Sequence, residues 1–154
     1  MSIKKADISD LNTVKIICDK TVSAVYPHYY SKGAVEFFLL HHSEKNISED
    51  IESGRVYLCI DNRNIVGTVT LNKNEICRLF VLPEYQGKGF GGELLDFAEN
   101  TIFESFGEIT LSASFPAKSI YIKRGYKETE FNIIKTNYND FLCYDTMVKN
   151  KENL

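Results

Sequence analysis

The sequence predicts a single α/β domain in which helices flank a central mixed, mostly antiparallel sheet. The chain has 154 residues, of which 44% are hydrophobic and 25% charged, and this length and composition are typical of one globular domain. Segments with a helical apolar period alternate with short β-branched and aromatic runs, which is the pattern of an α/β protein. No internal repeat or linker interrupts residues 1–154, so we expect them to form one domain.

Helices and a meander of strands are predicted in the N-terminal half. Residues 7–26 carry apolar side chains at helical spacing and predict an amphipathic helix. Residues 28–53 mix aromatic, histidine and acidic side chains, and Gly33 and Gly54 bracket one or two predicted short helices. Residues 55–82 contain three β-branched and aromatic runs separated by turn residues, which predicts an antiparallel meander of three strands.

The C-terminal half is predicted to alternate helices with strands. One predicted helix ends at Gly107 and another at Gly125, because glycine is favoured just after the last helical turn. The predicted elements are a helix over 90–106, a strand over 108–113, a helix over 114–124 and strands over 126–135 and 141–149. With one strand before the first helix, the predicted order is β-α-(α)-β-β-β-α-β-α-β-β.

Charge, hydropathy and cysteine spacing exclude several classes of protein. The net charge of −3 disfavours a nucleic-acid partner, whose phosphates require a basic surface. No apolar run reaches the ~18 residues of a spanning helix, and the first residues form no apolar leader, so we expect a cytoplasmic protein with no membrane partner. The four cysteines form no CxxC pair, and we expect buried, reduced thiols. His41 and His42 lack a third ligand at metal spacing, so no metal site is predicted.

Residues 86–92, with the sequence QGKGFGG, lie between a predicted strand and a predicted helix. Glycines let the backbone approach an anion, and the first N–H groups of a helix are free to bind it, so this loop is typical of a phosphate site. The loop fits the dinucleotide pattern G-x-G-x-x-G, but it follows the fourth strand instead of the first, and no acidic residue ends the next strand. It is not a Walker A motif, because Gly89 follows Lys88 where that motif requires Ser or Thr.

Residues 78–95 closely resemble the acetyl-CoA-binding motif of the GCN5-related N-acetyltransferase (GNAT) superfamily, whose signature is Q/R-x-x-G-x-G/A. Gln86, Gly89 and Gly91 occupy the fixed positions of that signature. Residues 117–126, with the sequence AKSIYIKRGY, resemble the second family motif, a helix that ends in an aromatic pair around glycine. The resemblance implies the GNAT fold and an acyl-CoA-dependent transferase.

The resemblance also implies acetyl-CoA as the co-substrate and the residues that would bind it. The backbone of the fourth strand would bind the pantetheine arm, and the glycine loop would bind the pyrophosphate at the helix N-terminus. The implied cofactor-binding residues are Leu79, Phe80, Val81, Gln86, Gly87, Lys88, Gly89, Phe90 and Gly91, with the Lys88 ammonium adding positive charge. Ser114 stands where relatives usually have an Asn that contacts the cofactor, so it either contacts the cofactor through a shorter side chain or N-caps the next helix.

Two residues resemble catalytic groups of the family. Tyr121 aligns with the tyrosine proposed to protonate the departing CoA thiolate, and a phenol of pKa ~10 is protonated at neutral pH; the alternative is a core aromatic. Glu75 lies eleven residues before Gln86, which is the spacing of the catalytic glutamate in the histone-acetylating branch, and it would be the general base. Many relatives pass this proton through water instead, and Glu75 also follows a turn where an exposed glutamate is ordinary.

Four residues are candidates to line the acceptor site: Tyr26, His28, Tyr29 and Tyr30, with a packed loop as the alternative. The expected activity is transfer of an acetyl group to a primary amine, of a small molecule or a protein, by direct attack in a ternary complex. The alternative function is a non-catalytic GNAT-fold module that binds acyl-CoA as a sensor or scaffold. A homodimer is left open as the assembly.

Overall fold

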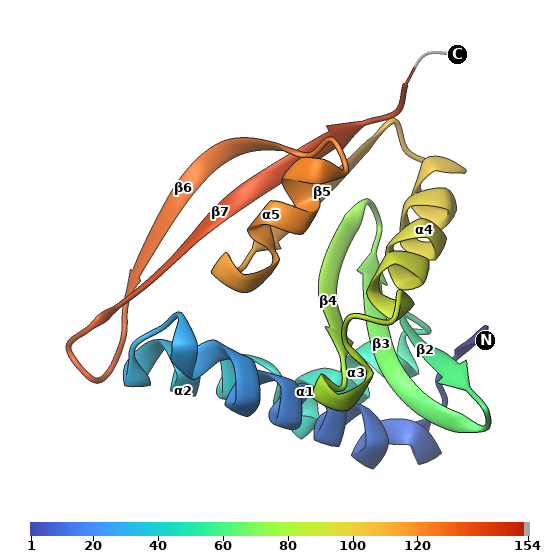
Figure 1. Cartoon of the computed structure of the whole chain (residues 1–154), viewed down its shortest axis with the longest axis horizontal. Coiled ribbons are helices and arrows are strands. Elements are labelled where there is room, and N and C mark those ends of the chain that lie inside the picture. Colours follow the sequence, from blue (N-terminus) through green and yellow to red (C-terminus); the bar gives the residue numbers. More distant parts are fainter. Residues whose placement is uncertain (153–154) are drawn as a thin grey trace.

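A seven-stranded mixed sheet lies at the centre of the structure, a computed structural model that describes residues 1–152 (Figure 1). The strands are β1 (Ser2–Lys5), β2 (Val56–Asp61), β3 (Asn64–Asn72), β4 (Glu75–Val81), β5 (Glu108–Ala113), β6 (Lys127–Lys135) and β7 (Phe141–Asn150). Their order in the sheet is β1-β2-β3-β4-β5-β7-β6. Neighbouring strands are antiparallel except β4 and β5, which are parallel, so the predicted fold class is confirmed.

Helices fill the connections between these strands. They are α1 (Leu11–Val25), α2 (Lys32–His41), α3 (Glu44–Glu52), α4 (Phe90–Phe103) and α5 (Phe115–Lys123), with short 3-10 turns η1 (Ile8–Asp10), η2 (Tyr26–His28) and η3 (Pro83–Tyr85). Within residues 1–152, none of the helices combines the length and the apolar character that crossing a membrane requires.

The two faces of the sheet carry separate hydrophobic cores, because side chains alternate along each strand. On one face, Val14 of α1 and Ile47 of α3 pack with Leu58 of β2. On the other face, Leu94 of α4 packs in a cluster that includes the next residue of β2, Cys59. The sheet is therefore sandwiched between the N-terminal helices and α4.

The predicted order of elements is confirmed, and residues 28–53 form two helices. Gly33 does not precede α2 but lies in its first turn, because Ser31 has the extended N-cap conformation and the helix begins at Lys32. A Cβ at Gly33 would collide with the side chains of Thr136 and Asp140, so close packing explains a glycine inside the helix.

Strands β4 and β5 pair over a very short distance. Only Glu75 with Thr110 and Ile76 with Leu111 are in register, whereas β5 pairs with β7 along its whole length. Beyond Ile76, β4 follows β3 and departs from β5. One backbone edge of β4 is therefore left without a strand partner.

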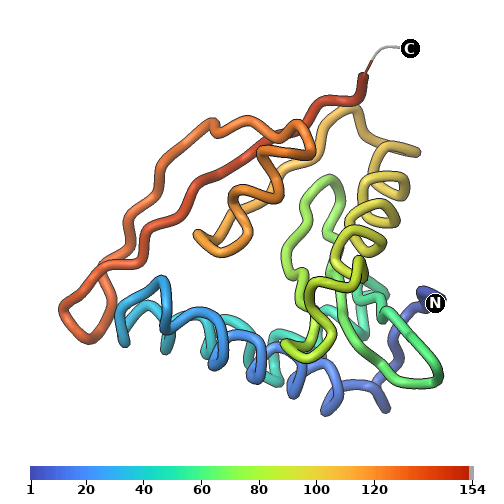
Figure 2. Tube along the Cα trace, in the orientation of Figure 1, coloured from blue at the N-terminus to red at the C-terminus, as the bar shows by residue number. Residues whose placement is uncertain are grey.

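The β6–β7 hairpin reaches from the sheet to the beginning of α2, as the trace in Figure 2 shows. The backbone N–H of Gly33 donates to Asp140 Oδ2 over 3.0 Å, and the Lys32 ammonium lies 5.1 Å from the centre of the Tyr138 ring. Thr136 and Asp140 also hydrogen-bond to each other through their side chains. The tip of the hairpin is thus fastened to the N-terminus of a helix from the opposite half of the chain.

Gly67 on β3 marks a place where three elements approach closely. A Cβ there would lie 2.9 Å from the Phe80 carbonyl oxygen of β4 and 3.0 Å from Leu94 Cδ1 of α4. These contacts are tighter than a side chain permits, so the missing Cβ allows α4 to pack directly on the sheet.

The cysteines differ in burial. Cys18 and Cys59 are buried, as expected, but Cys77 and Cys143 are only half-buried, and all four are free thiols. The expectation of four buried thiols is therefore wrong for two of them. Burial nevertheless raises the pKa of Cys18 to about 12 and that of Cys77 to about 11.

Replacing Leu94 with Ala tests the packing of α4 on the sheet. Leu94 is fully buried between α4 and β3, so Leu94→Ala is expected to lower the free energy of unfolding by about 2–5 kcal/mol, through lost burial and the cavity left behind. Urea denaturation measures the change. The matched control is Leu40→Ala, since Leu40 of α2 is 68% exposed, and equal losses for both variants would contradict the packing described.

Candidate active site

The glycine-rich loop between β4 and α4 forms an open backbone cradle. Gly87 and Gly89 have φ of +75° and +94°, in the left-handed region that favours glycine. A Cβ at Gly87, Gly89 or Gly92 would meet no atom within 4 Å, so the backbone is open to a ligand. The first N–H groups of α4 have no partner within the helix, and together with the helix dipole they favour an anion. A phosphate group fits this cradle.

Two side chains of the loop turn away from this cradle. Lys88 Nζ donates to the Glu84 carbonyl oxygen over 2.9 Å and lies 5.1 Å from the centre of the Tyr85 ring. The Phe90 ring also contacts Tyr85, with 6.0 Å between ring centres. The structure therefore brings the backbone of Lys88 and Phe90 to the cradle, but it holds the Lys88 charge against η3.

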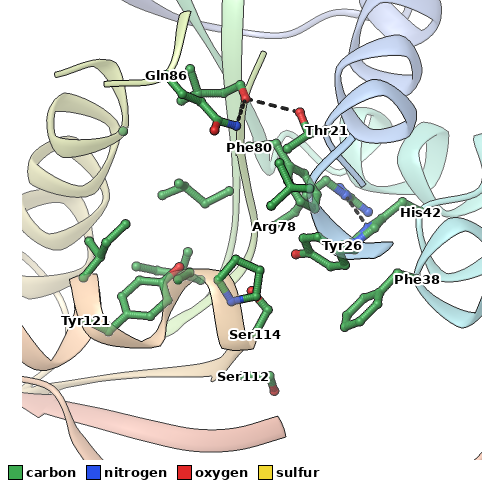
Figure 3. Close-up of a pocket in the computed structure, with 18 of the residues that line it drawn as sticks. Thr21, Tyr26, Phe38, His42, Arg78, Phe80, Gln86, Ser112, Ser114 and Tyr121 are labelled. Atoms are coloured by element: carbon green, nitrogen blue, oxygen red, sulfur yellow. Dashed lines mark hydrogen bonds between the residues drawn. The ribbon is translucent and has the colours of Figure 1, made fainter. Parts of the chain in front are cut away.

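The free edge of β4 supplies polar backbone groups to the cleft. The Val81 carbonyl oxygen accepts from Gln86 Nε2 at 3.0 Å and from Thr21 Oγ1 at 3.2 Å (Figure 3). Backbone groups alternate along a strand, so Leu79 presents its N–H and C=O to the same edge, while Phe80 pairs with Thr68 of β3. Of the three predicted strand residues, Leu79 presents both backbone groups to the open edge, and Val81 presents its N–H there.

A cavity of about 390 Å³ runs along this edge. It begins at Gln86 and Gly87, passes Leu79 and reaches Tyr121 of α5. Its walls come from α1, α2, β4, β5 and α5. An elongated ligand seated in the glycine cradle can therefore extend between β4 and α5.

Tyr121 is placed to face this cavity although its ring is packed in the core. It is only 8% exposed, and its ring meets Tyr126 with 5.5 Å between centres. Figure 3 shows the Tyr121 and Tyr26 hydroxyls turned toward the middle of the pocket from opposite sides. Burial raises the pKa of Tyr121, so the phenol is a proton donor at neutral pH.

Glu75 lies at the other end of the cleft. It lines a second cavity, of about 420 Å³, which shares Ile76, Arg78 and Ser114 with the first. Burial raises the pKa of the half-buried Glu75 carboxyl above its usual value. The structure thus places Glu75 and Tyr121 in separate lobes of one continuous cleft.

Ser114 stands where the two lobes join. It has the extended N-cap conformation before α5, but its side chain makes no capping hydrogen bond; its carbonyl oxygen accepts from the Lys118 N–H at 3.0 Å. Burial raises the pKa of Tyr26, and the Ser114 side chain, which lies against the Tyr26 hydroxyl, partly offsets this rise. Ser114 therefore has the position of an N-cap, with its hydroxyl left in the cleft.

Of the four predicted acceptor residues, only Tyr26 lines a cavity. Tyr26 is buried in the wall of the first cavity, whereas Tyr30 lines neither cavity and its hydroxyl accepts from the Phe115 N–H at 2.7 Å. Burial raises the pKa of Tyr30 to about 12. His28 and Tyr29 are exposed and line neither cavity, because η2 turns them to the outer surface.

A buried arginine was not anticipated as a site residue. Arg78 of β4 is 5% exposed, and its guanidinium donates to Thr70 at 2.8 Å, His42 Nδ1 at 3.1 Å and Asp50 at 3.1 Å. Burial and this cation lower the pKa of His42 to about 2, so His42 is a neutral acceptor. The only sequence signal for Arg78 was a charged residue within an apolar strand, and this signal did not indicate that Thr70, His42 and Asp50 would be its hydrogen-bond partners. Within the described chain, no group of three or more His, Cys, Asp and Glu side chains could hold a metal ion.

Comparison with known proteins agrees with this geometry. A family model for the acetyltransferase (GNAT) domain matches residues 25–144. A GCN5-related N-acetyltransferase from Rhodopseudomonas palustris is 23% identical, with a TM-score of 0.87 over 97% of this chain and 95% of that one. PaiA N-acetyltransferase from Thermoplasma acidophilum, solved in complex with coenzyme A, is 22% identical, with a TM-score of 0.73 over 97% and 98% of the two chains.

A third structure, Arabidopsis thaliana Naa50 in complex with the bisubstrate analogue CoA-Ac-MVNAL, is 23% identical, with a TM-score of 0.67 over 97% of this chain and 98% of that one. No curated protein sequence matches the chain. At these identities the solved structures show the fold, whereas the family model covers most of the sequence. On this evidence the chain belongs to the GNAT acetyltransferase family.

Proposed function

We propose that the protein is an N-acetyltransferase that uses acetyl-CoA and transfers the acetyl group to a primary amine by direct attack in a ternary complex. The observation that carries the proposal is the convergence of three features on one cleft. These are the glycine cradle, the free edge of β4 and the buried phenol of Tyr121.

The residues of the cleft fit acetyl-CoA along its length. The backbone from Gly87 to Gly91 suits the pyrophosphate, because it offers N–H groups at a helix N-terminus. The backbone of Leu79 suits the amides of the pantetheine arm, which require a strand-like partner. When bound, acetyl-CoA supplies the activated thioester carbonyl.

The chemistry requires a proton donor for the leaving thiolate and an acceptor for the proton of the amine. Tyr121 is the donor in this proposal, since burial keeps its phenol protonated. Glu75, which lies in the second lobe, accepts the amine proton through a water molecule. Burial raises the pKa of its carboxyl toward neutral pH, which suits a general base. Cys77 lines both lobes, but with a pKa of about 11 its thiol is protonated, which favours direct transfer over a cysteine intermediate.

The proposal is tested by measuring release of free CoA thiol from acetyl-CoA across a panel of primary amines. We expect at least one amine to accelerate thiol release, and its N-acetyl product is identified by mass spectrometry. CoA binding without any amine-dependent release would instead support a non-catalytic acyl-CoA-binding module.

Replacing Gly89 with Val tests the cradle. In the wild type, CoA at 100 times its dissociation constant is expected to raise the free energy of unfolding by about 2.7 kcal/mol. Gly89→Val should abolish this gain, because its side chain occupies the open space over the backbone. Thermal unfolding with and without CoA gives the difference, and Gly107→Val, at an exposed glycine outside the cradle, is the control. A wild type whose unfolding is indifferent to CoA would contradict the proposal.

Replacing Tyr121 with Phe tests the proton donor. The phenol acts only as the thiolate leaves, so Tyr121→Phe should lower kcat by about 10²-fold, the lower scale of general acid catalysis, with little change in the CoA dissociation constant. The control is Tyr126→Phe, because that ring contacts Tyr121 but does not line either cavity. Loss of stability with a normal kcat would make Tyr121 a core residue only.

Replacing Glu75 with Gln tests the base through pH dependence. The base form of Glu75 is lost as pH falls through its raised pKa, so the wild type should have an acidic limb in kcat/KM that Glu75→Gln removes, with a rate loss of about 10². The free energy of unfolding depends on pH in the opposite sense. Burial disfavours the ionised Glu75 carboxyl, so this residue destabilises the folded protein increasingly as pH rises through its raised pKa. Glu75→Gln should therefore not lower the free energy of unfolding at pH 7. Glu108→Gln is the control, because Glu108 is exposed at the start of β5 and lines neither cavity. An unchanged pH profile would assign the proton to water.

A further inference from the structure

We infer that Tyr26 is a second catalytic tyrosine of the cleft, whose phenol donates a hydrogen bond to the carbonyl oxygen of the bound thioester, and that Ser114 positions this phenol. This role rests on the proposed function, and it divides the chemistry of the cleft between the hydroxyl groups of Tyr26 and Tyr121. The sequence predicted only that Tyr26 would line the acceptor site.

The Tyr26 ring is held in one orientation by the aromatic side chains around it. Tyr26 follows α1 as the first residue of η2 and is only 7% exposed. The Phe38 ring meets it edge-on with 4.6 Å between ring centres, and the Tyr30 and Phe80 rings lie 5.6 and 6.3 Å away. The Tyr26 carbonyl oxygen accepts from the N–H groups of Tyr29 and Tyr30, both at 2.9 Å. The phenol therefore has the rigid support that a catalytic hydrogen-bond donor requires.

The Tyr26 hydroxyl enters the first cavity from the side opposite to Tyr121. Figure 3 shows both hydroxyls turned toward the middle of this pocket, although both rings are buried. Leu79, on the free edge of β4, lines the same space. A thioester that follows this edge would therefore lie between the two phenols.

Ser114 associates Tyr26 with the place where an acceptor would meet the thioester. The Ser114 side chain lies against the Tyr26 hydroxyl, and Ser114 lines both cavities, whereas Tyr121 lines only the first. In the proposed reaction the amine enters from the second cavity and attacks the carbonyl carbon. The carbonyl group then belongs at the junction of the cavities, beside Ser114 and Tyr26, and the sulfur belongs within the first cavity, beside Tyr121.

Two atoms gain negative charge in this reaction, and each needs a donor. As the lone pair of the amine nitrogen attacks the carbonyl carbon, the π electrons of the C=O bond move to the oxygen. When the C=O bond forms again, the C–S bond breaks and its electron pair stays on the sulfur. Tyr121 gives its proton to the sulfur, whereas Tyr26 keeps its proton and donates a hydrogen bond to the oxygen. The proton that Glu75 takes from the nitrogen returns to Tyr121 through water, so the protons balance.

The surroundings of Tyr26 favour its action as a donor. Burial raises the pKa of Tyr26 and of Tyr121, so both phenols keep their protons at neutral pH. A Ser114 hydroxyl that donates to the Tyr26 oxygen leaves the phenol O–H free for a ligand and makes it a stronger donor, because hydrogen bonds in a chain polarise one another. Such a donor is worth more in a buried site than in water.

Replacing Tyr26 with Phe removes the donor and keeps the ring. Because this hydrogen bond strengthens as charge develops on the oxygen, Tyr26→Phe should lower kcat by about 10²-fold, whereas the KM of the amine and the CoA dissociation constant should change by less than about threefold. Thiol release with the best amine gives the rates. The matched control is Tyr57→Phe, because Tyr57 is half-buried against Phe97 and lines neither cavity.

Infrared spectroscopy distinguishes the oxygen from the sulfur as the target of Tyr26. Acetyl-CoA with an isotope label at the carbonyl carbon is bound without an amine, and its C=O stretching frequency is compared with that of free acetyl-CoA. A hydrogen bond to the oxygen lowers this frequency, so we expect it to be lowered equally in the wild type and in Tyr121→Phe, and less in Tyr26→Phe. Ser114→Ala should fall between the wild type and Tyr26→Phe, both in frequency and in kcat.

A Tyr26→Phe enzyme with unchanged kcat and carbonyl frequency overturns this inference and leaves the proposed function intact. A raised KM of the amine with a normal kcat also overturns it, since Tyr26 would then only contact the acceptor. A frequency that responds to Tyr121→Phe instead of Tyr26→Phe contradicts the assignment of the two phenols. If Tyr26→Phe does not fold, Ser114→Ala decides. A protein that binds acetyl-CoA and acetylates none of the amines overturns the proposed function, and the carbonyl frequency alone then decides the Tyr26 contact.

Discussion

The short pairing of β4 with β5 is the constraint on which the cleft depends. After two residue pairs β4 continues with β3, while β5 is held along its length by β7. Buried backbone groups without partners are costly, so the separated edge needs other hydrogen bonds. Thr21 and Gln86 satisfy the Val81 carbonyl, and the remaining edge is available to a ligand. The sheet therefore creates a binding surface by leaving its own ladder incomplete.

The buried guanidinium of Arg78 organises the opposite side of the cleft. Taking a cation out of water is unfavourable unless hydrogen bonds replace its hydration, and three partners from three different elements provide them. Thr70 belongs to β3, His42 follows α2 and Asp50 belongs to α3, so one side chain joins the sheet to both helices. His42 accepts from Arg78 only in its neutral form, which its buried position maintains. The helical wall of the cleft is thereby fixed by polar contacts beneath its aromatic side chains.

The features that could be predicted from the sequence are those with a local signal. Alternation of apolar residues, glycines after helices and the QGKGFGG loop lie within short windows, and they predicted the order of elements along the chain, the end of α5 before Gly125 and a glycine loop between β4 and α4, although α4 ends at Phe103, earlier than the predicted end at Gly107. The backbone shape of the loop is also local, because it depends on the left-handed conformations of Gly87 and Gly89.

The features that could not be predicted depend on distant contacts. Gly33 and Asp140 are 107 residues apart, and Arg78 and His42 are 36 apart, so no pattern within one element indicates either pair. The direction of the Lys88 side chain depends on the position of Glu84 and Tyr85 in η3, and the exposure of His28 and Tyr29 depends on how η2 turns at the end of α1. Residue type suggested a role for these side chains, but tertiary packing determines where they lie.

Gly67 has a consequence for how this chain tolerates change. It carries no reacting group and lies inside the sheet, yet its missing Cβ sets the distance between β3, the Phe80 carbonyl and Leu94 of α4. Any side chain at this position must displace the Phe80 carbonyl of β4 or the Leu94 side chain of α4. Because α4 begins at the glycine cradle, a shift of this helix would also move its first N–H groups. Even alanine, the smallest side chain that could replace Gly67, is thus expected to destabilise the fold more than a large residue does at many exposed positions. A survey of substitutions across the chain would place Gly67 among its least variable sites and would give no hint, from chemistry alone, of the reason.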